Sequence, residues 1–211
     1  MSDGLISNVS LVIGFSGSGV NASIVRLAGL AGAIAGAISM AAGEWISISA
    51  QNELVTREVA VERNELIVNR RAEQAELVQM YEDHGMENGT ARRAAEEVMR
   101  STDQALAVHS REEFGLDPSE LPSALGAAAL SLLCFLVGAM LPVVPWMIGS
   151  GNAAKFGSIA LGVVAAAALG SAIGRYGNRN RFFTTLRQVA ILLIACAVTY
   201  GIGEALHVSV S

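Results

Sequence analysis

Four glutamates near the middle of this chain have the spacing expected of residues that bind one metal ion together. They form two pairs, and the members of each pair stand three residues apart, so they project from the same face of a helix. On one continuous helix all four would lie within about 80° of its circumference, because each residue advances the helix by about 100°. The four residues are Glu62, Glu65, Glu73 and Glu76.

The chemistry that this spacing favours is the binding of a divalent cation. Carboxylate oxygens are ligands of Mg²⁺, Ca²⁺ and Mn²⁺, and Fe²⁺ accepts carboxylate and imidazole together. His109 and Glu113, one helical turn apart, could add a nitrogen and a further oxygen. The alternative is a solvated acidic face that nearby arginines neutralise, with His109 as an ordinary packed or surface histidine.

A second group of polar residues lies in apolar sequence, where an ionisable side chain is costly. Asp3 opens the first apolar segment, and Met40 and Glu44 stand one helical turn apart in the next. A thioether beside a carboxylate suits a transition metal better than Mg²⁺ or Ca²⁺. The trio is therefore a candidate ion path through a membrane. The alternative is that Met40 packs in a core or against lipid while Glu44 reaches the membrane surface.

Composition places these two groups of residues in different parts of the protein, one charged and one apolar. Of the 211 residues, 52% are hydrophobic and only 16% are charged, whereas soluble domains carry about 25% charged residues. Residues 53–120 contain sixteen of the nineteen acidic residues and eight of the fourteen basic ones. We therefore predict an all-α membrane protein with membrane helices in residues 1–50, a cytosolic helical metal-binding domain in 51–120 and further membrane helices in 121–211.

Five segments are predicted to cross the membrane, since a bilayer core needs about 20 mostly apolar helical residues. They are residues 5–25, 27–48, 121–148, 156–173 and 189–202. The loop between the last two carries four arginines, so the positive-inside rule places that loop in the cytosol. Counting back through the spans, the insert and the N-terminus are also cytosolic, and the C-terminus lies on the opposite side.

The acidic insert is expected to be helical and continuous with the second span. Residues 47–83 contain no Pro or Gly, which predicts one long helix with a possible break at Asn69. A second helical stretch is expected from Ala91 past His109 to Gly115. In the spans, small residues repeat every fourth position in 32–36 and 162–174, which indicates close helix packing, either within one chain or across a dimer seam.

Three stretches together resemble the vacuolar iron transporter family of ferrous and manganous ion carriers. They are Ser2-Asp-Gly-Leu5, the run Gly36-Ala-Ile-Ser-Met-Ala-Ala-Gly-Glu44 and Glu113-Phe-Gly-Leu-Asp117. The resemblance implies five membrane helices with a three-helix cytosolic metal-binding domain between the second and third. It also implies a homodimer that exchanges a divalent metal ion for protons.

The resemblance also assigns roles to individual residues. Asp3 and Met40 match the membrane path of the family, and the glutamate pairs and Glu113 match the ligands of its soluble domain. His109 stands where the family has a methionine, which changes the softness of the ligand and adds sensitivity to pH. Gly32 stands where plant and parasite members have an acid, and Glu44 is a speculative replacement for that acid.

The sequence thus predicts a carrier that moves Fe²⁺ or Mn²⁺ out of the cytosol in exchange for protons. The metal ion is the substrate, and no cofactor and no nucleic acid partner are expected. The alternatives are a membrane protein that senses or stores metal without transport, and a structural protein whose acidic insert recruits a basic partner. We expect no enzyme, because no nucleophile–base pair, phosphate loop or cofactor fingerprint is present. A bacterial plasma membrane is slightly favoured over a vacuolar-type membrane.

Overall fold

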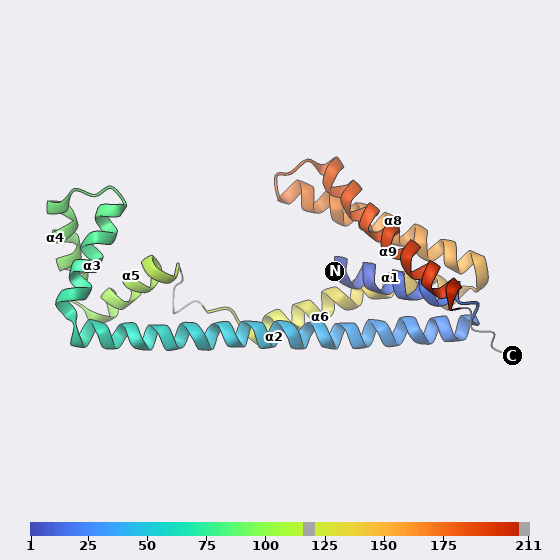
Figure 1. Ribbon diagram of the computed structural model, residues 1–211, viewed down its shortest axis with the longest axis horizontal. Coiled ribbons are helices and arrows are strands. Elements are labelled where there is room, and N and C mark those ends of the chain that lie inside the picture. The colour runs from blue at the N-terminus through green and yellow to red at the C-terminus, as the bar shows by residue number, and fades with distance from the viewer. Residues whose placement is uncertain (116–120, 207–211) are drawn as a thin grey trace. The chain divides into compact units, whose positions relative to one another are not determined.

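The computed structural model describes residues 1–115 and 121–206, and over these ranges the chain is helical, with no β-strand (Figure 1). The helices are α1 (Ser2–Gly17), α2 (Ala22–Val68), α3 (Arg70–Asp83), α4 (Asn88–Val98), α5 (Thr102–Phe114), α6 (Ala124–Met140), the 3₁₀ helix η1 (Leu141–Val143), α7 (Val144–Ile148), α8 (Gly151–Tyr176) and α9 (Arg181–Ala205). The predicted all-α class is confirmed.

The chain divides into two compact units, and α2 contributes to both. The membrane unit comprises residues 1–45 together with the part of the chain from Leu125 onward. The insert unit comprises residues 46–124. The second predicted span does continue as helix into the insert, because α2 is 47 residues long, more than twice the length that a bilayer core requires.

Four helical segments of the described chain are long and apolar enough to cross a membrane. They are 22–68, 124–148, 151–176 and 181–205. The expectation of a single span over residues 5–25 is wrong, because α1 ends at Gly17 and α2 begins at Ala22. The turn between them uses Gly19 at a φ of 79°, a conformation that glycine adopts without strain. With 16 residues, α1 is shorter than the other four, so the count of five spans stays a prediction.

Helix α1 is held in the membrane unit by an apolar core that it shares with α8 and α9 (Figure 1). Leu5, Val9 and Ile13 of α1 cluster there with Ala166, Leu192 and Cys196. The small residues of α8 permit this close approach: a Cβ on Gly170 would lie 2.6 Å from the Cα of Thr185 in α9. This stripe of small residues therefore packs within the chain.

A second apolar cluster joins α2 to α6. Ala33 and Ala37 of α2 pack against Phe135 and Ala139 of α6, and the ring of Phe135 occupies the space that a Cβ on Gly36 would need. The small residues at 32–36 of α2 therefore also make contacts within the chain, and Gly32 and Gly36 line the cavity described below.

The insert unit is a small helical domain with its own core. Leu66 of α2, Leu77 of α3, Ala95 of α4 and Leu106 of α5 are buried together. The expected helix from Ala91 to Gly115 is interrupted, because α4 ends at Val98 and Ser101 caps α5 by accepting a hydrogen bond from the backbone N–H of Gln104 (3.4 Å). Gly115, at a φ of 63°, terminates α5 where the sequence predicted.

Candidate metal sites

The two glutamate pairs lie on two different helices. Asn69 leaves the helical conformation, with φ −114° and ψ 31°, and becomes the N-cap of α3. Glu62 and Glu65 consequently belong to α2, and Glu73 and Glu76 belong to α3. The prediction of one four-glutamate stripe on a continuous helix is wrong, because the angular count does not carry across a break. The pairs meet instead around a residue of α5.

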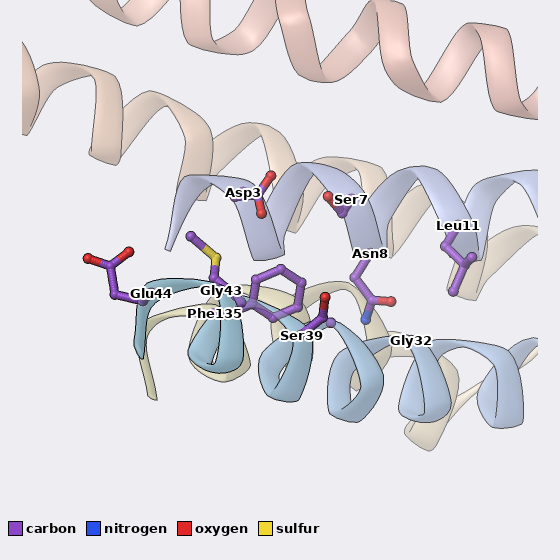
Figure 2. Close-up of a pocket in the computed structure, with 11 residues that line it drawn as sticks. Asp3, Ser7, Asn8, Leu11, Gly32, Ser39, Gly43, Glu44 and Phe135 are labelled. Atoms are coloured by element: carbon purple, nitrogen blue, oxygen red, sulfur yellow. The ribbon is translucent and has the colours of Figure 1, made fainter. Parts of the chain in front are cut away.

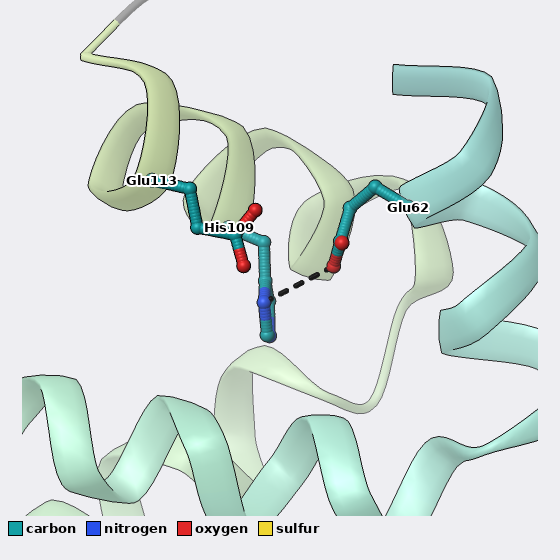
Figure 3. Close-up of side chains that lie close together, drawn as sticks. All are labelled: Glu62, His109 and Glu113. Carbon is teal, nitrogen blue, oxygen red and sulfur yellow. Dashed lines mark ion pairs between the residues drawn. The ribbon is translucent and has the colours of Figure 1, made fainter. Parts of the chain in front are cut away.

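That residue is His109, which is fully buried in the insert unit. Its Nδ1 lies 3.2 Å from Oε1 of Glu62 and 3.8 Å from Oε2 of Glu73. Figure 3 shows the imidazole of His109 and the carboxylate of Glu62 turned toward each other from α5 and α2. The alternative of a surface histidine is therefore wrong.

Glu113 lies one turn beyond His109 on α5 and completes a three-residue group. One ligand atom from each of Glu62, His109 and Glu113 lies within 4.8 Å of the other two (Figure 3). Two carboxylates and an imidazole are a donor set that Fe²⁺ and Mn²⁺ accept. The three residues come from α2 and α5, so only the folded insert unit brings them together.

Several polar atoms of this group are buried without hydrogen-bond partners among the described residues, since the ion pair of His109 with Glu62 does not have hydrogen-bond geometry. They are both ring nitrogens of His109 and Oε1 of Glu62, and the Oγ of neighbouring Ser110 is in the same state. Buried polar groups are nearly always hydrogen-bonded, and leaving one unsatisfied destabilises the fold. A cation at this point would satisfy both the imidazole and the carboxylate.

The electrostatics of the group also favour a cation. Burial, with the nearby charges of Glu113 and Glu73, raises the pKa of Glu62 from 4.5 to about 7. Burial, together with Glu76 and Glu73, raises the pKa of Glu113, and burial lowers the pKa of His109. The pKa values of the two glutamates are raised because their carboxylates lie close to other carboxylates and are partly removed from water. A bound dication would relieve that repulsion.

The remaining two predicted ligands lie at the edge of the group. Glu76 is exposed, and its carboxylate lies close enough to Glu113 to contribute to the raised pKa of Glu113. Glu65 is half-buried and accepts a hydrogen bond from the side-chain amide of Asn69. Its charge is close enough to contribute to the raised pKa of Glu73. All six residues predicted for the insert therefore lie in or beside one cluster.

The three residues predicted for the membrane path line one cavity of the membrane unit. This cavity has a volume of about 550 Å³ and lies between α1, α2 and Phe135 of α6 (Figure 2). Its lining residues are Asp3, Ser7, Asn8, Leu11, Gly32, Gly36, Ser39, Met40, Gly43, Glu44 and Phe135. Asp3 is exposed, Glu44 is half-buried and Met40 is 36% exposed. Two carboxylates and a thioether around one space form a donor set for a transition metal.

Glu44 does not occupy the position that an acid at residue 32 would fill. Gly32 and Glu44 are twelve residues apart on α2, which is about 18 Å along a helix. The space beside Gly32 is filled by α1: a Cβ there would lie 2.6 Å from Cδ2 of Leu11 and 2.9 Å from Oδ1 of Asn8. Sequence reasoning missed Asn8, although an amide in an apolar helix is itself a signal of a packing or functional role.

Comparison with known proteins gives one family and several relatives. The model of the VIT family matches residues 1–204. Vacuolar iron transporter 1 of Oryza sativa subsp. japonica is 28% identical over 208 residues, which cover 98% of this chain and 82% of that protein. Vacuolar iron transporter 1 of Eucalyptus grandis is 28% identical, with 98% and 84% covered. Vacuolar iron transporter 1 of Arabidopsis thaliana is 26% identical over 205 residues, with 97% and 82% covered.

Proposed function

The chain belongs to the VIT family, and from this premise we propose that it exports Fe²⁺ or Mn²⁺ from the cytosol in exchange for protons. Membership of this family makes the protein a multi-pass integral membrane transporter of metal ions and not an enzyme. The ion identity, the direction, the proton coupling and the residues involved are our proposals.

The observation that supports transport most directly is the cavity of the membrane unit. Asp3, Met40 and Glu44 surround it, and they come from α1 and α2. Ionisable groups in membrane helices are costly and are associated with ion pathways. A protein that only senses or stores metal needs ligands in its soluble part and has no use for ligands in its membrane part. We therefore favour a transporter over the sensing or storage alternative.

Proton exchange follows from the chemistry of carboxylate ligands. A metal ion and a proton compete for the same oxygen atoms, so loading the ion releases protons and protonation releases the ion. In our proposal protonation of Asp3 and Glu44 displaces the ion from their carboxylates, and the ion moves through the cavity toward the side opposite the cytosol. The direction rests on the arginine-rich loop, which contains Arg175, Arg179, Arg181 and Arg187 and which the positive-inside rule places in the cytosol.

The insert unit would capture the ion before transport. We propose that Glu62, His109 and Glu113 are its central ligands, supported by Glu73, Glu76 and Glu65. The unsatisfied buried nitrogens of His109 support this role, because an ion would give them a partner. We also propose α1 as a fifth membrane helix, since its apolar residues pack along α8 and α9.

Assembly and location are further proposals. We propose a homodimer, as the family resemblance implies. The relatives named above are vacuolar transporters, which favours a vacuolar-type membrane, and they give no support to the expected bacterial plasma membrane.

Metal flux into proteoliposomes under a pH gradient tests the proposed function. We expect the purified chain to move Fe²⁺ or Mn²⁺ when protons flow the other way. Asp3→Asn and Met40→Ala should strongly lower this flux, because the first removes a charged carboxylate that can exchange protons and the second removes the thioether. The matched controls Glu204→Gln and Met147→Ala change exposed residues outside the cavity and should retain it. Undiminished flux in Asp3→Asn and Met40→Ala would show that the cavity is not the path.

A further inference from the structure

Asn8 is a buried polar residue in the middle of α1, and only 2% of its surface is exposed. Its side-chain nitrogen donates to two backbone carbonyls, that of Gly29 in α2 at 3.1 Å and that of Ala139 in α6 at 2.5 Å. Both partners are acceptors only, so the NH₂ group must face them. This fixes the orientation of the amide and places its oxygen on the other side.

The Oδ1 atom of Asn8 has no hydrogen-bond partner in the described chain, although it is buried. Asn8 lines the same cavity as Asp3 and Met40, and Figure 2 shows its amide directed into the space between α1 and α2. An unsatisfied buried carbonyl oxygen destabilises a fold unless a ligand or an ordered water completes it. The fold therefore presents a preoriented oxygen acceptor to the cavity.

The facing residue of α2 places no side chain against this oxygen. Gly32 has no side chain, and a Cβ at that position would lie 2.9 Å from Oδ1 of Asn8. Any larger residue would therefore crowd the oxygen. Along the cavity, Asp3 and Glu44 are labelled toward one end in Figure 2, and Asn8 and Gly32 lie toward the other. The oxygen of Asn8 is thus a separate position along the wall of the same cavity.

We propose that Oδ1 of Asn8 is a neutral oxygen ligand for the divalent ion in the membrane cavity. The amide oxygen would bind the ion toward one end of the cavity, and the carboxylates and thioether would bind it toward the other, so that the ion occupies these positions in turn. Amide oxygens are hard donors, which suit Mn²⁺ better than Zn²⁺. Asn8 therefore raises the preference of the cavity for the harder ion. This inference rests on the proposed function in assuming that an ion enters the cavity.

Equilibrium binding of Mn²⁺ and Zn²⁺ to the full chain in lipid nanodiscs tests this assignment without relying on transport. The chain would carry Glu62→Gln and His109→Ala, so that the insert site is silenced and the remaining binding reports the cavity. In this background we expect Asn8→Ala to lower Mn²⁺ affinity about tenfold, the size typical of losing one supporting polar group at a metal site. Zn²⁺ affinity should fall much less.

The control for Asn8→Ala is Ser158→Ala. Ser158 is also fully buried and donates to the carbonyl of Pro142 at 2.6 Å, but it lies outside the cavity. It reports the effect of losing a buried hydrogen bond in the membrane unit, and it should leave the ratio of Mn²⁺ to Zn²⁺ affinity unchanged. If Asn8 has a purely structural role, Asn8→Ala should also leave the ratio of Mn²⁺ to Zn²⁺ affinity unchanged.

A second variant keeps Asn8 and its hydrogen bonds. Gly32→Ala adds a Cβ that crowds Oδ1 and should lower the same affinity ratio. Gly201→Ala is its control, because nothing lies within 4 Å of a Cβ at Gly201. The proposal is overturned if the background chain binds no Mn²⁺, if Asn8→Ala and Gly32→Ala leave the ratio unchanged, or if both ions weaken equally. Failure of the flux experiment alone would refute transport and leave this assignment standing.

Discussion

His109 is the residue around which the insert cluster is organised. It is fully buried, and neither ring nitrogen has a hydrogen-bond partner in the part of the chain that the structure describes. Burial lowers its pKa, so the neutral form, which is the form that binds metals, dominates at neutral pH. The imidazole is therefore ready to act as a ligand, and it adds a nitrogen to a site otherwise made of oxygens.

Removing the imidazole should weaken metal binding by the insert. We expect His109→Ala to lower the Mn²⁺ affinity of the full chain at the insert by about ten- to a hundredfold, measured by isothermal titration calorimetry. His84→Ala is the control, since His84 is exposed and its Nδ1 lies 3.5 Å from Glu112, which is not one of the proposed ligands. Equal affinities in the two variants would mean that His109 is not a ligand.

The raised pKa of Glu62 predicts how stability changes with pH in the absence of metal. Its folded pKa of about 7 exceeds its ordinary value of 4.5, so the folded state binds the proton more tightly than the unfolded state. The resulting stabilisation is fully present below about 4.5 and is lost as the pH rises through about 7. Metal-free protein should therefore unfold at a lower temperature at pH 8 than Glu62→Gln does.

Thermal unfolding of the full chain in detergent with a chelator measures this effect. The comparison with Glu62→Gln isolates Glu62 from His109, whose lowered pKa acts in the opposite direction below about 6.5. Adding Mn²⁺ at pH 8 should raise the unfolding temperature of the native chain and have less effect on Glu62→Gln. A difference between the two chains that does not change with pH would contradict the assignment.

At the scale of elements, two helix boundaries position the insert cluster. The break at Asn69 turns α3 away from α2, so that Glu73 approaches His109 from a second helix. Ser101 is the N-cap of α5, which begins at Thr102. This starting point sets which residues of α5 face the cluster. A helix that ran on from α4 would carry His109 on a different face.

Loss of the Ser101 cap should therefore affect stability and binding together. Ser101→Ala removes the acceptor for the N–H of Gln104 and should lower the free energy of unfolding by about 1 kcal/mol, with a weaker Mn²⁺ affinity at the insert. The control is Thr56→Ala, which removes a bond from Oγ to the carbonyl of Asn52 inside α2 and should be near neutral. Denaturant unfolding and calorimetry would show both effects. Unchanged stability would mean that α5 begins without this cap.

For the whole molecule, we expect variants of the insert unit and of the membrane unit to change the kinetics of flux in different ways. The insert variant His109→Ala should raise the Mn²⁺ concentration at half-maximal flux, because capture is impaired, and should retain the maximal rate. The cavity variant Asp3→Asn should lower the maximal rate and leave Mn²⁺ binding by the insert intact. Flux kinetics and calorimetry on the same preparations check this split. Identical kinetic defects in both variants would contradict a division of labour between the units.

Most of the architecture, and every candidate ligand except Asn8, could be predicted from the amino-acid sequence. The long apolar runs predicted membrane helices, since their length and composition are set by the bilayer. The concentration of charge in residues 53–120 predicted the insert, and helical spacing selected Glu62, Glu65, Glu73, Glu76, His109 and Glu113. Local composition and periodicity are properties of the chain itself, so they need no tertiary contact to be recognised.

The arrangement of those ligands was decided by tertiary structure. The sequence offered Asn69 as a break, but periodicity could not decide between a break and a continuous helix, because the conformation there depends on how α3 packs in the insert core. It also could not show that His109 is buried beside Glu62, or that the amide of Asn8 is fixed by carbonyls of α2 and α6. Ligand geometry depends on contacts between residues far apart in sequence. Spacing thus identified which side chains can bind a metal, and folding determined which of them share one site.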